Sequence, residues 1–108
     1  MTVKEFSQKQ KLNFLVESDP LREIKGGYCG DLLSWVMSRM NADDCWFTVM
    51  GNINTIAVAV LADCACIVLC ENASLDDDAR IRAKEQNINV LTTESKAFSL
   101  AVKLGSLL

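Results

Sequence analysis

Apolar residues in this chain form two alternating patterns: short continuous runs, and longer segments with a helical period. The continuous runs predict strands at 14–16, 46–49, 64–69 and 88–91, with an extended segment over 22–28. Helix-start signals and apolar residues spaced three and four apart predict helices over 2–10, 31–41, 53–62, 74–84 and 94–107. Because strands alternate with helices, we expect one α/β domain spanning 1–108, a helix–sheet–helix sandwich around a mixed, largely parallel sheet.

Polar residues mark the expected starts of three helices. Thr2, with Glu5 three residues later, has the pattern of a capping box. Asp31 and Ser74 are each expected to cap the helix that follows. The segment 53–62 has helical spacing, although its β-branched residues also suit a strand; we favour the helix.

One tryptophan lies outside the apolar stripe of its predicted helix. That stripe consists of Leu32, Leu33, Val36, Met37 and Met40. Trp35 is on another side of the helix, and the helix 53–62 is apolar almost throughout. A single core of this size leaves part of that apolar surface uncovered, which predicts a homodimer with Trp35 at the interface.

The composition narrows the classes of partner. The chain has 108 residues, a net charge of −3 and a pI near 4.8, which argues against nucleic-acid binding because that begins with a basic field. The longest apolar runs, 56–62 and 64–70, are far too short to span a membrane, and the first twelve residues do not resemble a secretory signal. We therefore expect a soluble, cytoplasmic protein.

The five cysteines are expected to be reduced thiols, and the chain contains no histidine. The absence of histidine removes the commonest general base and the commonest metal ligand. Cys64, Cys66 and Cys70 follow a strand pattern and not the spacing of an iron–sulfur or zinc site, so burial is favoured. Cys29 and Cys45 are expected to be more exposed. We predict no metal site and no cofactor. We treat the acidic pair Asp43-Asp44 as a loop and the acidic run Asp76-Asp77-Asp78 as the first turn of a helix.

Three of the five glycines, Gly26, Gly27 and Gly30, lie within five residues before a predicted helix. Such a segment forms either a tight structural turn, which we favour, or an anion-binding loop whose amides Arg22 and Asn54 would assist. We expect Gly27 to adopt a positive φ that a β-carbon disfavours. Cys29 lies in this segment but has no nearby base.

Several short motifs together resemble the DRTGG domain family over nearly the whole chain. They are Arg22-x3-Gly26-Gly27-Tyr28, Asp31-Leu32-Leu33-Ser34, Trp46-x-Thr48, Asn54-x2-Ala57-Val58-Ala59 and Ser95-x-Ala97-Phe98. The aspartate and threonine of the family signature are replaced by Leu21 and Lys25. The resemblance is to short stand-alone members encoded near iron-only hydrogenase and electron-transfer subunits in anaerobic bacteria, and it implies a fold similar to the N-terminal domain of the phosphocarrier-protein serine kinase/phosphatase.

The resemblance also implies an accessory function. Our leading hypothesis is a non-catalytic regulatory or scaffolding domain in redox or fermentative metabolism, with a hydrogenase or electron-transfer subunit as a partner. The alternative is a sensor of a nucleotide-like anion that uses the 26–31 segment. A third, less favoured hypothesis is an iron–sulfur or redox accessory subunit that uses the cysteines.

Overall fold

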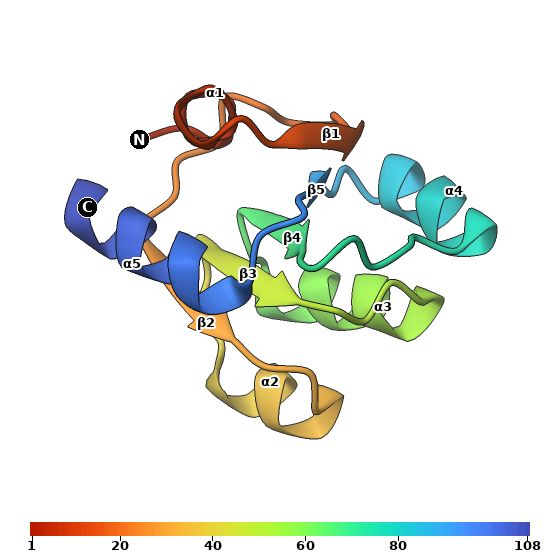
Figure 1. Cartoon of the computed structure of the whole chain (residues 1–108). Helices are drawn as coiled ribbons and strands as arrows, with labels where there is room; N and C mark the ends of the chain where they lie inside the picture. Colours follow the sequence, from red (N-terminus) through yellow and green to blue (C-terminus); the bar gives the residue numbers. More distant parts are fainter.

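A five-stranded mixed sheet forms the middle layer of the computed structural model, which describes residues 1–108 (Figure 1). Its strands are β1 (Asn13–Val16), β2 (Gly26–Cys29), β3 (Asp44–Thr48), β4 (Cys66–Leu69) and β5 (Val90–Thr92). The order across the sheet is β1-β5-β4-β3-β2. Strands β2 to β5 run parallel, and β1 pairs with β5 in the antiparallel direction. The prediction of a mixed, largely parallel sheet is therefore confirmed.

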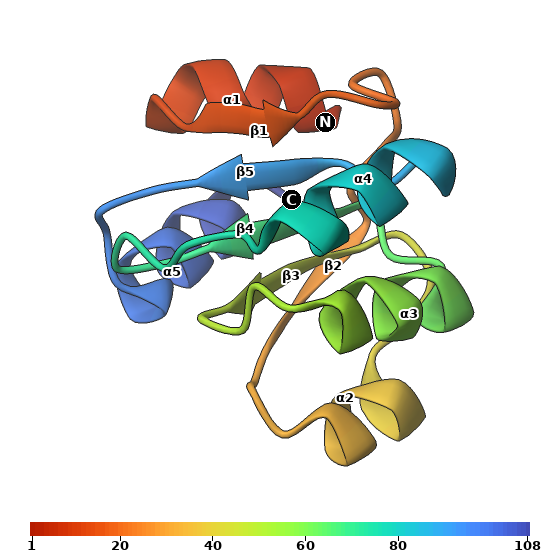
Figure 2. The same cartoon turned by 90° about the vertical axis from the view of Figure 1, so that its right-hand side faces the viewer.

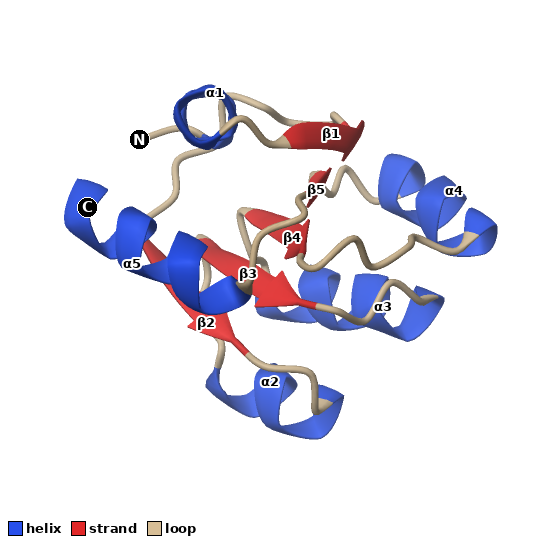
Figure 3. Cartoon of the chain, in the orientation of Figure 1, coloured by secondary structure: helices blue, strands red, loops and turns tan.

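Five helices cover both faces of this sheet, as the sequence predicted (Figures 1 and 3). They are α1 (Val3–Gln10), α2 (Leu33–Arg39), α3 (Ile53–Ala62), α4 (Asp77–Glu85) and α5 (Ala97–Leu107). Helices α2, α3 and α4 lie side by side on one face, and α5 lies behind the sheet (Figure 2). Each of α2, α3 and α4 connects two neighbouring parallel strands, so these three crossover connections lie on the same face of the sheet. None of the five helices has the length and hydropathy to cross a bilayer.

The apolar core has two layers, one on each side of β3 and β4. Trp46 and Ile67 face the layer under α2, α3 and α4, whereas Phe47 and Val68 face the layer under α1 and α5. Every residue of these two strands is buried. Burial on both faces explains why β4 and the middle of β3, Cys45 to Phe47, are continuously apolar instead of alternating. The two polar residues of β3, Asp44 and Thr48, lie at its ends.

Two of the predicted helix caps are wrong, and one is confirmed. Thr2 and Glu5 form the reciprocal capping box of α1. Helix α2 begins without a side-chain cap, because Asp31 instead accepts hydrogen bonds from the end of β3, from Thr48 Oγ1 at 2.7 Å and from the Val49 amide at 3.0 Å. Helix α4 starts after Asp76 and not at Ser74.

The segment 53–62 forms a helix, α3, and not a strand, as the sequence favoured. The Asn52 side chain caps this helix by accepting a hydrogen bond from the Thr55 amide at 3.1 Å.

The predicted apolar stripe of α2 is only partly correct. Val36 and Met40 are buried, whereas Leu32 and Met37 are exposed. Helix α2 packs beside the edge strand β2 and has a helix neighbour, α3, on one side only, so its flanking apolar residues stay uncovered.

The glycines Gly26 and Gly27 lie in the edge strand β2 and not in a loop. No glycine in the chain has a positive φ, so the conformation predicted for Gly27 is wrong. The constraint at both positions is close approach instead. A β-carbon at Gly26 would lie 2.6 Å from Asp44 Oδ1, and one at Gly27 would lie 3.2 Å from Leu104 Cδ2.

Arg22 connects the turns at the amino ends of the parallel strands. Its guanidinium lies 2.9 Å from Asp43 Oδ1 and 3.0 Å from Asp63 Oδ1, and it donates to the Asp63 carbonyl at 2.7 Å. Both aspartates have left-handed backbones, with φ of 65° and 58°. The hydrogen bond from Arg22 lowers the pKa of Asp43 below its ordinary value. One side chain thereby fixes the turns that lead into β3 and β4.

Replacing Asp43 with asparagine tests this ion pair without straining the backbone, because asparagine also tolerates a positive φ. At pH 7 we expect the Tm to fall by about 2–4 °C, since partly exposed pairs contribute modestly. The lowered pKa of Asp43 means that its contribution is present above the ordinary carboxyl pKa and is lost as the pH falls through the lowered value. The difference between the thermal melts of the two proteins should therefore shrink as the pH falls from 7 to below the ordinary carboxyl pKa. A constant difference across this range, or an equal effect of Glu17→Gln at an exposed site, contradicts the assignment.

The neighbouring glycines should respond differently to alanine. Asp44 is buried and its other oxygen accepts the Asn41 amide at 2.9 Å, so it has no room to move away from a β-carbon at Gly26. We expect Gly26→Ala to lower the free energy of unfolding by about 2 kcal/mol. At Gly27 only the methyl end of Leu104 must shift, and alanine also restricts the unfolded chain, so we expect a change within about 0.5 kcal/mol. Urea unfolding of both variants measures the difference, and equal losses contradict it.

Candidate functional site

The carboxyl ends of β2, β3, β4 and β5 lie at the same edge of the sheet because these strands are parallel. Open α/β sheets bind ligands outside the carboxyl ends of their strands, where connecting loops diverge. Two hollows open along this edge. These two hollows are therefore the places to examine for a binding site.

The first, here the thiol hollow, has a volume of about 260 Å³ and lies beyond the ends of β2, β3 and β4. Its lining residues are Cys29, Gly30, Asp31, Phe47, Thr48, Val49, Cys70, Glu71 and Ala97. The wall is rigid: Gly30 accepts a hydrogen bond from Trp46 Nε1 at 2.9 Å, and Asp31 holds the end of β3. Two carboxylates, those of Asp31 and Glu71, make this hollow unfavourable for an anion.

Neither thiol of the thiol hollow is activated. Burial, and then the charge of Asp31, raise the pKa of Cys29. Burial raises the pKa of Cys70 to about 11, with Cys29, Glu71 and Asp31 adding to the effect. At neutral pH both groups are therefore protonated and weakly nucleophilic. They also lie on β2 and beyond β4, which are separated by β3, roughly 9.5 Å across the sheet and too far for a disulfide.

The remaining cysteines belong to the core. Cys64 and Cys66 are buried as predicted, and so is Cys70, but Cys45 is also buried, contrary to expectation. Cys45 pairs directly with Cys66 on the neighbouring strand, and burial raises its pKa well above the ordinary value. Cys64 precedes β4 and packs in the opposite layer from Cys66. No group of three or more cysteine, aspartate or glutamate side chains is arranged to hold a metal ion.

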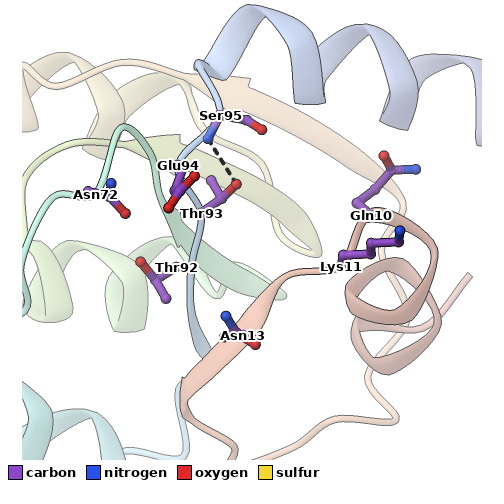
Figure 4. A pocket seen from close by; sticks show the side chains of 8 residues that line it. All are labelled: Gln10, Lys11, Asn13, Asn72, Thr92, Thr93, Glu94 and Ser95. Carbon is purple, nitrogen blue, oxygen red and sulfur yellow. Dashed lines mark hydrogen bonds between the residues drawn. The ribbon is translucent and has the colours of Figure 1, made fainter.

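The second, here the polar hollow, has a volume of about 310 Å³ and no apolar residue in its lining (Figure 4). Four segments supply its walls: the end of α1, the start of β1, the turn after β4 and the segment that follows β5. The lining residues are Gln10, Lys11, Asn13, Asn72, Thr92, Thr93, Glu94 and Ser95.

The polar groups of this hollow are largely uncommitted. Thr93 Oγ1 accepts a hydrogen bond from the Ser95 amide at 3.1 Å, and it is the one lining side chain engaged within the chain. Lys11 and Glu94 supply one cation and one anion, and neither forms an ion pair. The backbone is left-handed at two of the lining residues, Lys11 and Asn72, with φ of 55° and 58°. The polar hollow offers amide, hydroxyl and charged groups to a small polar molecule.

The structure does not bring the predicted site residues together. Gly30 lines the thiol hollow, whereas Arg22 and Gly26 lie at the opposite, amino end of β2. Gly27 lies on the edge strand next to α5, and Asn54 is exposed in the first turn of α3, outside both hollows. Sequence reasoning missed the polar hollow. The one feature of the sequence that could have indicated this hollow is the run of polar residues at 92–95, directly after a predicted strand.

Trp35, the predicted interface residue, lies outside the buried stripe of α2 as expected. Its side chain is 55% exposed, and the Arg39 guanidinium lies 3.9 Å from the ring centroid. This cation–π contact covers one face of the indole and leaves the other open.

Comparisons with known proteins bear on the fold. Neither a protein-family model nor a curated protein matches the sequence. A similar solved structure contains the CBS and DRTGG domains of the regulatory region of a Clostridium perfringens pyrophosphatase, complexed with its activator diadenosine tetraphosphate. The TM-score is 0.75 at 10% identity, over 94% of this chain and 44% of that one. The chain thus spans less than half the length of that protein's chain, and its fold is that of a DRTGG-like domain, as its sequence motifs predicted.

Proposed function

We propose that this chain is a non-catalytic regulatory domain that works through association with other proteins, as a homodimer in the cytoplasm. The observation that carries the proposal is the shared fold with the regulatory region of a pyrophosphatase, in which such a domain accompanies other modules. Folds host many functions, so the argument also needs support from the surface and the site of this chain.

The chemistry of the carboxyl edge supports a function without catalysis. The chain has no histidine, and both thiols in the thiol hollow are protonated at neutral pH. A general base near neutrality and an activated nucleophile are the usual requirements of acid–base and covalent catalysis. The side chains at this edge supply neither.

The outer surfaces of the helices support association. Large apolar side chains are exposed on α2, α3, α4 and α5; they include Leu32, Trp35, Leu61, Ile81, Phe98 and Val102. Contiguous apolar surface on a small domain commonly marks a protein interface. The free thiols, four of them buried, support a reducing compartment.

The partner implied by the family resemblance is a hydrogenase or electron-transfer subunit of fermentative metabolism. In that setting we propose that the chain acts as a scaffold or regulator and not as a carrier of a cluster. Four of its five thiols are packed in the core, where a cluster would require the sheet to open.

Light scattering coupled to size exclusion tests the association. We expect the wild-type chain to elute as a dimer at tens of micromolar, because its exposed apolar area favours self-association at that concentration. A monomer whose mass does not change between low and high protein concentration contradicts the proposed homodimer.

A second candidate function is the sensing of a small ligand, favoured by the uncommitted side chains of the polar hollow. The 26–31 segment is a weaker candidate, because Arg22 is already engaged by two aspartates and the nearby hollow is acidic. The volume of the polar hollow is enough for one nucleoside end of a dinucleotide and too small for the whole molecule.

Thermal shift measurements test this sensing function. We expect diadenosine tetraphosphate and adenosine to raise the Tm of the wild type saturably, by an amount that grows with concentration. The double variant Thr92→Val with Ser95→Ala removes two lining hydroxyls and should lose the response. Asn54→Ala lies outside the hollow and should keep it. If Asn54→Ala loses the ligand-induced rise in Tm and the double variant keeps it, the binding site lies near Asn54 and not in the polar hollow. If the Tm of the wild type does not rise with either ligand, the sensing function is wrong.

A further inference from the structure

Helix α5 is apolar on two sides. Leu100 and Leu104 point into the core and are buried. Beside this buried side, residues three and four apart form a stripe, here the α5 stripe, of Phe98, Ala101, Val102, Gly105 and Leu108. Ala101 is half-buried against the core, and the other four are exposed. Its large members are well exposed, Phe98 by 79%, Val102 by 56% and Leu108 by 53%. A surface helix normally turns polar residues to this side, so the stripe needs a cover.

A hollow of about 210 Å³ opens where the stripe meets the edge strand β2. Phe47 and Leu104 form its floor, and Gly27, Gly105 and Leu108 lie at its rim. A β-carbon at Gly105 would meet no atom within 4 Å, so a larger side chain can be placed there without a clash. The hollow, here the α5 hollow, is apolar and large enough for an aromatic ring.

The most exposed side chain of the stripe and the α5 hollow are two helical turns apart on the same helix. Phe98 and Gly105 are separated by seven residues, about 10.5 Å along the axis. If two α5 helices pack antiparallel about a two-fold axis between Ala101 and Val102, each Phe98 lies opposite Gly105 of the other copy. One rotation therefore fills both hollows and covers both rings, which is the self-complementarity of an isologous interface.

We propose that α5 forms the two-fold contact of this protein, packing antiparallel against α5 of a second copy with each Phe98 seated in the opposite α5 hollow. The inference rests on the proposed function only in taking the chain to be a homodimer. It assigns the contact to α5 in place of the α2 surface around Trp35, whose ring is already covered on one face by Arg39.

The area and charge of the stripe suit a second copy. Its exposed apolar surface is on the order of 400 Å², close to the apolar part of the roughly 800 Å² that each partner contributes to a standard interface. The stripe carries no charged residue, so pairing it with itself brings no like charges together. Antiparallel packing also places each helix amino end beside the carboxyl end of the other, which the helix dipoles favour.

The contact would also cover part of β2. Cys29 is the one exposed cysteine of the chain and lines the α5 hollow. A ring seated in that hollow restricts access to its thiol. Alkylation of Cys29 therefore reports on this surface independently of the oligomeric state.

The experiment compares four forms of the full chain by light scattering and by the rate of Cys29 alkylation. Phe98→Asp removes the inserted ring, and Gly105→Leu fills the hollow while improving the helix propensity, so its fold is expected to be at least as stable. We expect both variants to dissociate, with the dimer Kd raised at least tenfold and Cys29 alkylated several-fold faster. Trp35→Asp is the matched control and should remain dimeric with Cys29 protected as in the wild type.

Three results overturn the inference. A dimer that persists in both Phe98→Asp and Gly105→Leu with unchanged Cys29 protection removes α5 from the contact and leaves the proposed homodimer standing. If only the Trp35→Asp dimer dissociates, the dimer contact lies on α2 and not on α5. A wild-type chain that is monomeric at all concentrations removes the homodimer together with its interface. Circular dichroism of each variant confirms that dissociation is not unfolding.

Discussion

The burial of β3 and β4 on both faces is the constraint on which the rest of the molecule depends. Two strands with no exposed residue require helices above and below the sheet, and the chain supplies three on one face and two on the other. Apolar side chains then fill the middle of both sheet faces, and the buried polar residues of β3, Asp44 and Thr48, lie at the ends of that strand. Binding groups can lie only at the strand ends and on the outer sides of the helices.

The polar side chains at the amino ends of the parallel strands have hydrogen-bond or ion-pair partners within the chain, whereas most of those at the carboxyl ends do not. At the amino end, Arg22 is shared between Asp43 and Asp63, and Asp44 fills the space beside Gly26. At the carboxyl end, most side chains of the polar hollow have no partner within the chain. A satisfied polar network stabilises a fold, whereas uncommitted groups around a hollow can exchange water for a ligand. This difference directs any ligand function to the carboxyl end.

Periodicity predicted the elements because it reports local burial, and it identified α3 and the layered sheet correctly. It failed where a side chain acts over a long range: Asp31 bonds to residues seventeen and eighteen positions away instead of capping its own helix. The residues of the candidate site lie apart in the structure for a geometric reason. Arg22 and Gly30 are close in sequence, but eight residues of largely extended chain separate them by up to about 26 Å. The polar hollow joins segments near 10, 72 and 93, a proximity that only the topology creates.

The family-signature residues that this chain retains differ in burial and contacts from those that are replaced. Arg22, Gly26 and Gly27 are held by ion pairs or by close packing. Leu21 is 70% exposed and the Lys25 side chain 71% exposed, so neither side chain is packed in the core, although Lys25 Nζ lies 3.7 Å from Asp43 Oδ2. If the signature marked a binding site, the exposed positions free to contact a ligand would be the ones retained. In this chain the retained motif residues join β2 to the turns before β3 and β4.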